Sequence, residues 1–81
     1  MQYINAPNQL GKILAARRKT LRLSQSEVAA KLGISQNRLS ELEDRADKLT
    51  VDRLLSLLNL LGLELSVRQR SAVQDASRVE W

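Results

Sequence analysis

The segment Leu23–Glu43 constrains the fold more than any other part of the chain. It reads LSQSEVAAKLGISQNRLSELE, and Ser24 followed by Glu27 fits a capping box at the start of a helix. Gly33 suits the left-handed residue that ends such a helix, and Ser35 caps a further helix only two residues later. Two short helices joined by a glycine-containing turn pack into a compact corner. The segment therefore predicts a helix-turn-helix.

Apolar residues at three- and four-residue spacing predict one helix on each side of this corner. The first spans about residues 7 to 21 and begins near Pro7, whose fixed φ is tolerated at a helix start. The last begins after Thr50, ends at Gly62 and is apolar around most of its circumference, so more than one surface must cover it. The apolar residues on which this pattern rests are Leu10, Ile13, Leu14, Leu21, Val28, Ala29, Leu32, Ile34, Leu39 and Leu42, and in the last helix Val51, Leu54, Leu55, Leu57, Leu58 and Leu61.

The hydrophobic period changes after Gly62. Residues 63–68, LELSVR, alternate strictly between apolar and polar, which is typical of a half-buried strand. A lone strand has no partner in its own chain, so we expect it to pair with the same strand of a second copy across a two-fold axis. The sequence thus predicts an all-α domain over residues 1–69 that ends in one short strand. A polar, flexible tail follows over residues 70–81.

Composition excludes several classes of function. The chain has 81 residues, neither Cys nor His, and a net charge of +4. Thiolate and imidazole metal sites, Cys nucleophiles and a Ser-His-Asp triad are therefore excluded, and we expect no enzyme, no cofactor and no metal. Tyr3 and Trp81 are the only aromatic residues, too few for a single-stranded nucleic-acid platform. No apolar run could span a membrane, so we expect a cytoplasmic protein.

Polar residues at the start of the third helical stretch suit the DNA major groove. Amide side chains read adenine, arginine reads guanine, and glutamate accepts a hydrogen bond from cytosine. The candidate base-reading residues are Ser35, Gln36, Asn37, Arg38, Ser40 and Glu41. Helix starts and cations suit the DNA backbone. The candidate phosphate contacts are Ser24, Gln25, Lys31, Arg45 and Lys48.

The pattern Q-x3-A-x3-G-I-S-x3-L-x2-L-E resembles the phage-repressor-like (XRE/Cro-C1) helix-turn-helix family over about residues 10 to 62. The matching residues are Gln25, Ala29, Gly33, Ser35, Leu39, Leu42 and Glu43. The resemblance implies a lambda-repressor-like domain of four to five helices that binds palindromic operator DNA as a homodimer. It also implies that Gln25 braces both a phosphate and Gln36, and that Arg18 pairs with Glu43 beneath the corner.

The flanking segments resemble the HipB-type antitoxins. The resemblance lies in I-x-x-P-x-Q-L-G over Ile4–Gly11, in TVDRLLSLLNLLGLEL over Thr50–Leu65, and in a polar tail ending in Glu80 and Trp81. Members of that family repress their own operon and bind a HipA-like Ser/Thr kinase toxin. The resemblance implies that Trp81 anchors the toxin and that three residues lie in an intersubunit sheet, namely Leu63, Leu65 and Val67.

Two alternatives remain open from the sequence. A stand-alone or phage-type regulator without a toxin would share the helix-turn-helix and the strand. A protein-interaction module that has lost DNA binding is favoured by Glu41, Asp44 and Asp47, because acids near the groove repel phosphates. The operator sequence, the toxin's identity and the role of the tail do not follow from the residues.

Overall fold

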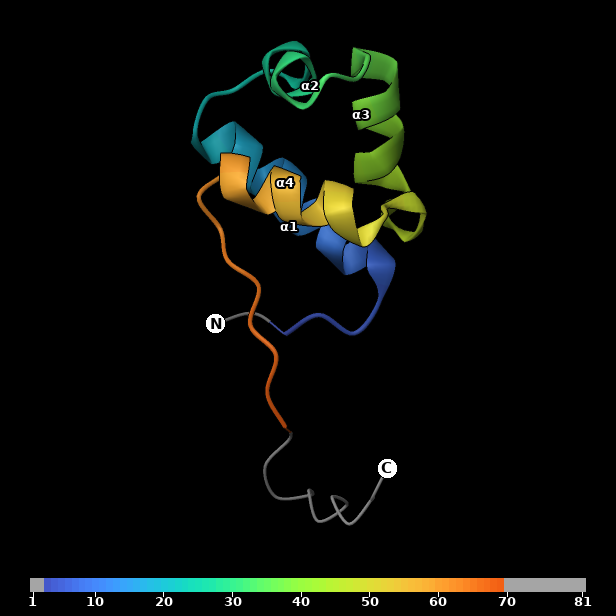
Figure 1. The fold of residues 1–81 in the computed structure, drawn as a ribbon, viewed down its shortest axis with the longest axis vertical. Coiled ribbons are helices and arrows are strands. Elements are labelled where there is room, and N and C mark those ends of the chain that lie inside the picture. Colours follow the sequence, from blue (N-terminus) through green and yellow to red (C-terminus); the bar gives the residue numbers. More distant parts are fainter. Residues whose placement is uncertain (1–2, 70–81) are drawn as a thin grey trace.

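The computed structural model describes residues 3–69 of the chain (Figure 1). These residues form four α-helices and one short 3-10 helix: α1 (Pro7–Thr20), α2 (Gln25–Leu32), α3 (Gln36–Asp44), η1 (Ala46–Lys48) and α4 (Val51–Leu60). Helix α3 packs against α1, α2 and η1, and α2 also contacts α4. None of the helices in this part of the chain is long and apolar enough to cross a membrane.

The helices begin where the sequence predicts because side chains satisfy their first amide groups. The Ser24 hydroxyl accepts from the Glu27 amide at 3.0 Å, and the Glu27 carboxylate accepts from the Ser24 amide at 2.7 Å. Ser35 caps α3 in the same way, accepting from the Arg38 amide at 3.0 Å. Thr50 caps α4, and its hydroxyl accepts from the amide three residues later at 3.1 Å. Each predicted cap is present.

Helices α1, α2 and α4 are each followed by a backbone position with positive φ. Gly33 closes α2 at φ 74°, and Gly62 follows α4 at φ 71°, a region that costs glycine nothing. Helix α1 ends at Thr20, one residue before the expected end, and Arg22 just beyond it adopts φ 60°. The turn between α1 and α2 thus places a non-glycine residue in the left-handed region. No feature of the sequence predicts this conformation at Arg22.

All four α-helices contribute leucine or other small apolar side chains to the core. Its buried members are Leu14, Val28, Ala29, Leu39, Leu42, Ala46, Leu57, Leu58 and Leu61. Ala46 belongs to η1, the short 3-10 helix between α3 and α4. Leu32 at the end of α2 and Ile34 of the α2–α3 turn are partly buried against this core. Apolar packing therefore holds the inner side of the corner.

Gly11 allows α1 to lie directly against the end of α3. A Cβ atom at this position would collide with the backbone carbonyl oxygen of Glu43. Backbone atoms cannot move aside as a flexible side chain would, so the two helices would have to separate. The small residue at position 11 thus sets how closely the last turn of α3 approaches α1.

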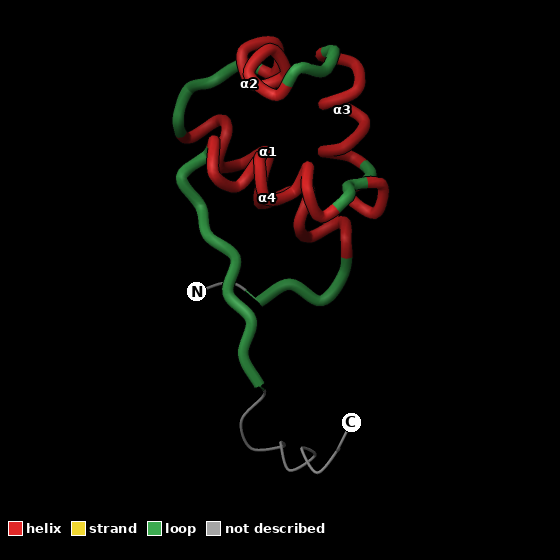
Figure 2. The backbone as a smooth tube through the Cα atoms, in the orientation of Figure 1, coloured by secondary structure: helices red, strands yellow, loops and turns green. Residues whose placement is uncertain are grey.

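The segment after Gly62 leaves the helical body and runs past the N-terminal segment (Figures 1 and 2). The Arg68 guanidinium donates a hydrogen bond to the Tyr3 hydroxyl at 3.2 Å, which links the two segments. Within residues 3–69 no β-strand is formed, so the strand expected over residues 63–68 is not present in the single chain. Its pairing with a second copy remains a prediction, because such a strand needs hydrogen-bond partners on another chain.

Candidate nucleic-acid interface

Helices α2 and α3 form the predicted corner, and the corner turns the first residues of α3 outward (Figure 1). Val28, Ala29 and Leu39 are at most 1% exposed where the two helices meet. The turn is closed by a hydrogen bond from the Ile34 amide to the Ala29 carbonyl at 3.0 Å. With its apolar side chains buried, α3 presents its polar residues to the outside.

The predicted base-reading residues lie on this outer side. Ser35, Gln36, Asn37 and Arg38 are exposed, and Ser40 and Glu41 are half-buried. Leu39 and Leu42, which alternate with them at helical spacing, are buried. The amide and guanidinium groups at the start of α3 are therefore available to a ligand.

Ser26 of α2 holds the Gln36 side chain, and the sequence reading missed this residue. The Ser26 hydroxyl donates to Gln36 Oε1 at 3.0 Å. The resemblance assigned this role to Gln25, which was wrong for this chain: Gln25 Nε2 donates instead to Glu43 Oε1 at 2.9 Å. Successive helix positions point about 100° apart, so neighbouring side chains of α2 reach opposite ends of α3. This rotation between Gln25 and Ser26 is the feature from which the contact of Ser26 with Gln36 could have been predicted.

Arg18 and Glu43 form an ion pair beneath the corner, as the resemblance implied. Arg18 Nε lies 2.7 Å from Glu43 Oε2 and its Nη2 lies 3.1 Å from Oε1. The two side chains are only 9% and 8% exposed. Arg18 Nη1 also donates to the Leu23 carbonyl at 3.0 Å. Together with the Gln25 contact, the pair ties α1, the α1–α2 turn, α2 and the end of α3 into one network.

Glu41 binds two of the predicted DNA-contacting cations. Its Oε1 accepts from Arg38 Nη1 at 2.7 Å and its Oε2 accepts from Lys48 Nζ at 2.9 Å. These hydrogen bonds, first that from Lys48 and then that from Arg38, lower the pKa of the Glu41 carboxyl below its ordinary value. The carboxylate stays ionised at neutral pH, and the structure thus brings Arg38, Glu41 and Lys48 together.

The remaining phosphate candidates are spread over the surface. Arg45 pairs with Asp47 at 3.0 Å, and this contact lowers the pKa of the Asp47 carboxyl and raises the pKa of the Arg45 guanidinium. Lys31 lies exposed in the last turn of α2. Ser24 and Gln25 stand at the other end of that helix, where Ser24 serves as the cap. The structure does not gather these residues into one cluster.

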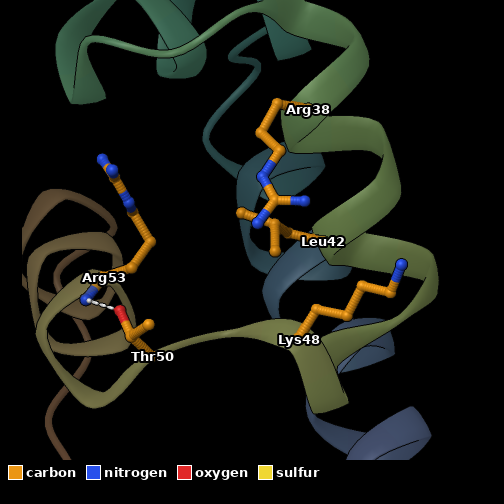
Figure 3. A pocket seen from close by; sticks show the side chains of 5 residues that line it. All are labelled: Arg38, Leu42, Lys48, Thr50 and Arg53. Atoms are coloured by element: carbon orange, nitrogen blue, oxygen red, sulfur yellow. Dashed lines mark hydrogen bonds between the residues drawn. The ribbon is translucent and has the colours of Figure 1, made fainter.

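A shallow hollow of about 100 Å³ lies between α3, η1 and the start of α4 (Figure 3). Figure 3 shows Arg38 and Lys48 on one side of it and Arg53 on the other. Leu42 and Thr50 complete its lining. Sequence reasoning missed Arg53, whose Nη1 donates to the Leu32 carbonyl at the end of α2 at 2.9 Å. Its place in the next helix gave no hint that it faces α3.

The remaining predictions concern the toxin anchor, metal binding and the segment after Gly62. The toxin anchor Trp81 and the tail over residues 70–81 lie outside them. Among residues 3–69 no group of three or more His, Cys, Asp or Glu side chains is arranged to hold a metal ion. Leu63 is half-buried, whereas Leu65 is 54% and Val67 is 87% exposed.

The corner and its flanks are shared with known proteins. A family described as "Helix-turn-helix domain" matches residues 2–70. Among solved structures, chains in a HipA-HipB-O2-O3 complex and in a HipB-O4 20mer complex each match with 31% identity and a TM-score of 0.75 over 84% of this chain and 96% of theirs. A chain in a HipB-O1-O2 complex matches equally over 99% of its length. No curated protein matches. This chain therefore belongs to the helix-turn-helix family and is of the HipB type.

Proposed function

We propose that this chain is a sequence-specific DNA-binding repressor that inserts the start of α3 into the major groove. The observation that carries the proposal is the exposed run Gln36, Asn37 and Arg38 above a buried Leu39. A helix anchored by apolar contacts on one side and polar on the other has the shape and chemistry to read base edges. The 31% identity to HipB chains solved in complexes with O1, O2, O3 and O4 supports the same conclusion.

The residues divide into base readers and backbone contacts. Gln36 and Asn37 suit adenine, Arg38 suits guanine or a phosphate, and Glu41 suits cytosine. Ser35 and Ser40 offer hydroxyl groups to a base edge or a phosphate. The proposed backbone contacts are Ser24, Gln25, Lys31, Arg45 and Lys48. A net charge of +4 favours association with duplex DNA and makes it salt-dependent.

The proposed binding unit is a homodimer. Val51 of α4 is 69% exposed and Leu55 is 42% exposed, and Leu65 and Val67 add further uncovered apolar surface. A second copy that pairs its C-terminal segment with this one would cover such residues and complete a strand at Leu63, Leu65 and Val67. Two recognition helices about 34–36 Å apart would then read the half-sites of a palindromic operator.

The proposed biological role is that of an antitoxin that represses its own operon and binds a HipA-like Ser/Thr kinase. This role rests on the HipB-type flanking segments and on the similarity to HipB in a HipA-HipB-O2-O3 complex. Trp81 is the proposed anchor for the kinase. Deletion of residues 71–81 tests the anchor: we expect it to abolish co-purification with a kinase encoded beside this gene, and unchanged kinase binding would contradict it.

DNA binding is tested by mobility shift on the duplex upstream of the chain's own gene, with a random duplex of equal length as competitor. We expect the upstream duplex to be preferred by at least about a hundredfold. Asn37→Ala should reduce that preference, whereas Asn59→Ala, the same change at an exposed position of α4, should leave it unchanged. Equal binding of both duplexes by the unaltered protein would overturn the repressor function.

A further inference from the structure

Glu41 uses both of its carboxylate oxygens to bind cations that the proposed function assigns to DNA. Arg38, one turn earlier in α3, binds Oε1 at 2.7 Å, and Lys48 of η1 binds Oε2 at 2.9 Å. The three side chains are 40–46% exposed, so solvent and a ligand can reach all of them. In the free protein, the Glu41 carboxylate therefore binds two cations that would otherwise be available to DNA phosphates.

Glu41 also stands on the face of α3 that would meet the groove. It follows the exposed Asn37 by four residues, and residues at this spacing share one face of a helix. DNA phosphates repel an ionised carboxylate on this face, and its negative charge leaves Arg38, Glu41 and Lys48 with a summed charge of +1. A duplex without a hydrogen-bond donor for Glu41 is therefore attracted less strongly to this cationic surface.

A base with an exposed amino group would reverse this balance. In the major groove the cytosine N4 amino group donates one hydrogen bond, since its other hydrogen is paired with guanine, and a glutamate carboxylate accepts it. Arg38 and Lys48 are also donors only, so this N–H competes with both of them for the Glu41 carboxylate. The displaced cations then bind phosphate oxygens through charge-assisted hydrogen bonds.

We propose that Glu41 determines specificity by withholding Arg38 and Lys48 from the DNA backbone until a cytosine amino group takes their place. The inference rests on the proposed DNA-binding function and adds a coupling between base reading and phosphate binding. Glu41 thereby acts against non-specific DNA as well as in favour of the correct site.

The first test measures affinity for a random duplex as a function of salt. Glu41→Gln removes the charge but keeps the shape, so Arg38 and Lys48 become free to bind phosphates. We expect affinity for the random duplex to rise on the order of tenfold. The slope of log K against log salt should steepen by about 0.9 for each cation that is freed in each subunit. Asp44→Asn, a matched loss of charge at the exposed last residue of the same helix, should change neither the affinity nor the slope to this extent.

The second test measures base preference by selecting duplexes from a random library. We expect the unaltered protein to select cytosine at one position of each half-site, and Glu41→Gln to lose that preference on the order of tenfold. Equal effects of Glu41→Gln and Asp44→Asn on random duplex, or an unchanged preference, would overturn the inference and leave the repressor function standing. An unaltered protein that binds no duplex would overturn both. Melting temperatures of both variants identify any loss of folding.

Discussion

Arg18 of α1 and Glu43 in the last turn of α3 form a two-pronged ion pair, at 2.7 and 3.1 Å, in which both side chains are more than nine-tenths covered. The pair lies at the opposite end of α3 from Gln36 and Asn37, two of the residues proposed to read bases. Because Gln25 and the Leu23 carbonyl complete its hydrogen bonds, the pair is satisfied inside the protein. It holds the recognition helix at one end while the other end protrudes.

We expect Glu43→Gln to destabilise the protein by about 3 kcal/mol, because the charge of Arg18 would remain buried without a counter-charge. Urea unfolding monitored by circular dichroism measures the change. Glu41→Gln is the matched control, since it breaks ion pairs that lie at the surface and contribute little to stability. Equal losses in the two variants would show that the buried pair has no special role.

We expect Gly11→Ala to destabilise the protein by about 1–3 kcal/mol even though alanine favours helices. The added Cβ would meet the backbone carbonyl oxygen of Glu43, so α1 and α3 would separate. Lys12→Ala, the neighbouring exposed position of the same helix, is the control and should have little effect. A Gly11→Ala variant with a raised melting temperature would contradict the close approach of the two helices.

The sequence predicts the helices well because their signals are local. Ser24, Ser35 and Thr50 stand at the helix starts and their hydroxyl groups accept the expected amide hydrogens. Gly33 ends α2 in the left-handed conformation that its type allows. Such features depend on residues three or four positions apart, and a single sequence displays them directly.

The contacts around the site depend on how the helices cross, which local signals do not contain. Gln25 was assigned to Gln36, but it lies on the side of α2 that faces Glu43, and Ser26 meets Gln36 instead. Arg53 faces the end of α2 from a helix that was considered only for its leucines. The strand expected after Gly62 would need hydrogen-bond partners on a second chain, so it stays a prediction.

We expect Ser26→Ala to weaken base discrimination without affecting stability. The Ser26 hydroxyl donates to Gln36 Oε1 at 3.0 Å and so restricts the Gln36 side chain. Without this contact the Gln36 side chain is mobile and loses more conformational entropy when it binds a base. Ordering one such side chain on binding costs about 1 kcal/mol, which corresponds to roughly a fivefold loss of preference at one position. Library selection measures this, with Ser56→Ala on the exposed part of α4 as the control. Unchanged selection by Ser26→Ala would exclude a role for this contact.

We expect acid unfolding to become less steep in Glu27→Gln. The Ser24 amide, followed by the Ser24 hydroxyl, lowers the pKa of the Glu27 carboxyl below its ordinary 4.5. A lowered folded-state pKa stabilises the protein above the unfolded value, and this stabilisation disappears as the pH falls through the folded value. The variant should therefore be less stable at pH 7 and approach the unaltered protein well below pH 4.5. Thermal melts from pH 7 to pH 3 measure the difference, and parallel curves would contradict it.

We expect Leu65→Glu to prevent dimer formation and to weaken operator binding. Leu65 is 54% exposed in the single chain, and the alternation of residues 63–68 places it on the same face as Leu63 and Val67. A carboxylate on that face would be buried without a counter-charge when two segments pair. Ser66→Glu introduces the same charge on the opposite face and should remain dimeric. Analytical ultracentrifugation compares the two variants; a dimeric Leu65→Glu would mean that helical surfaces such as Val51 and Leu55 hold the subunits together instead.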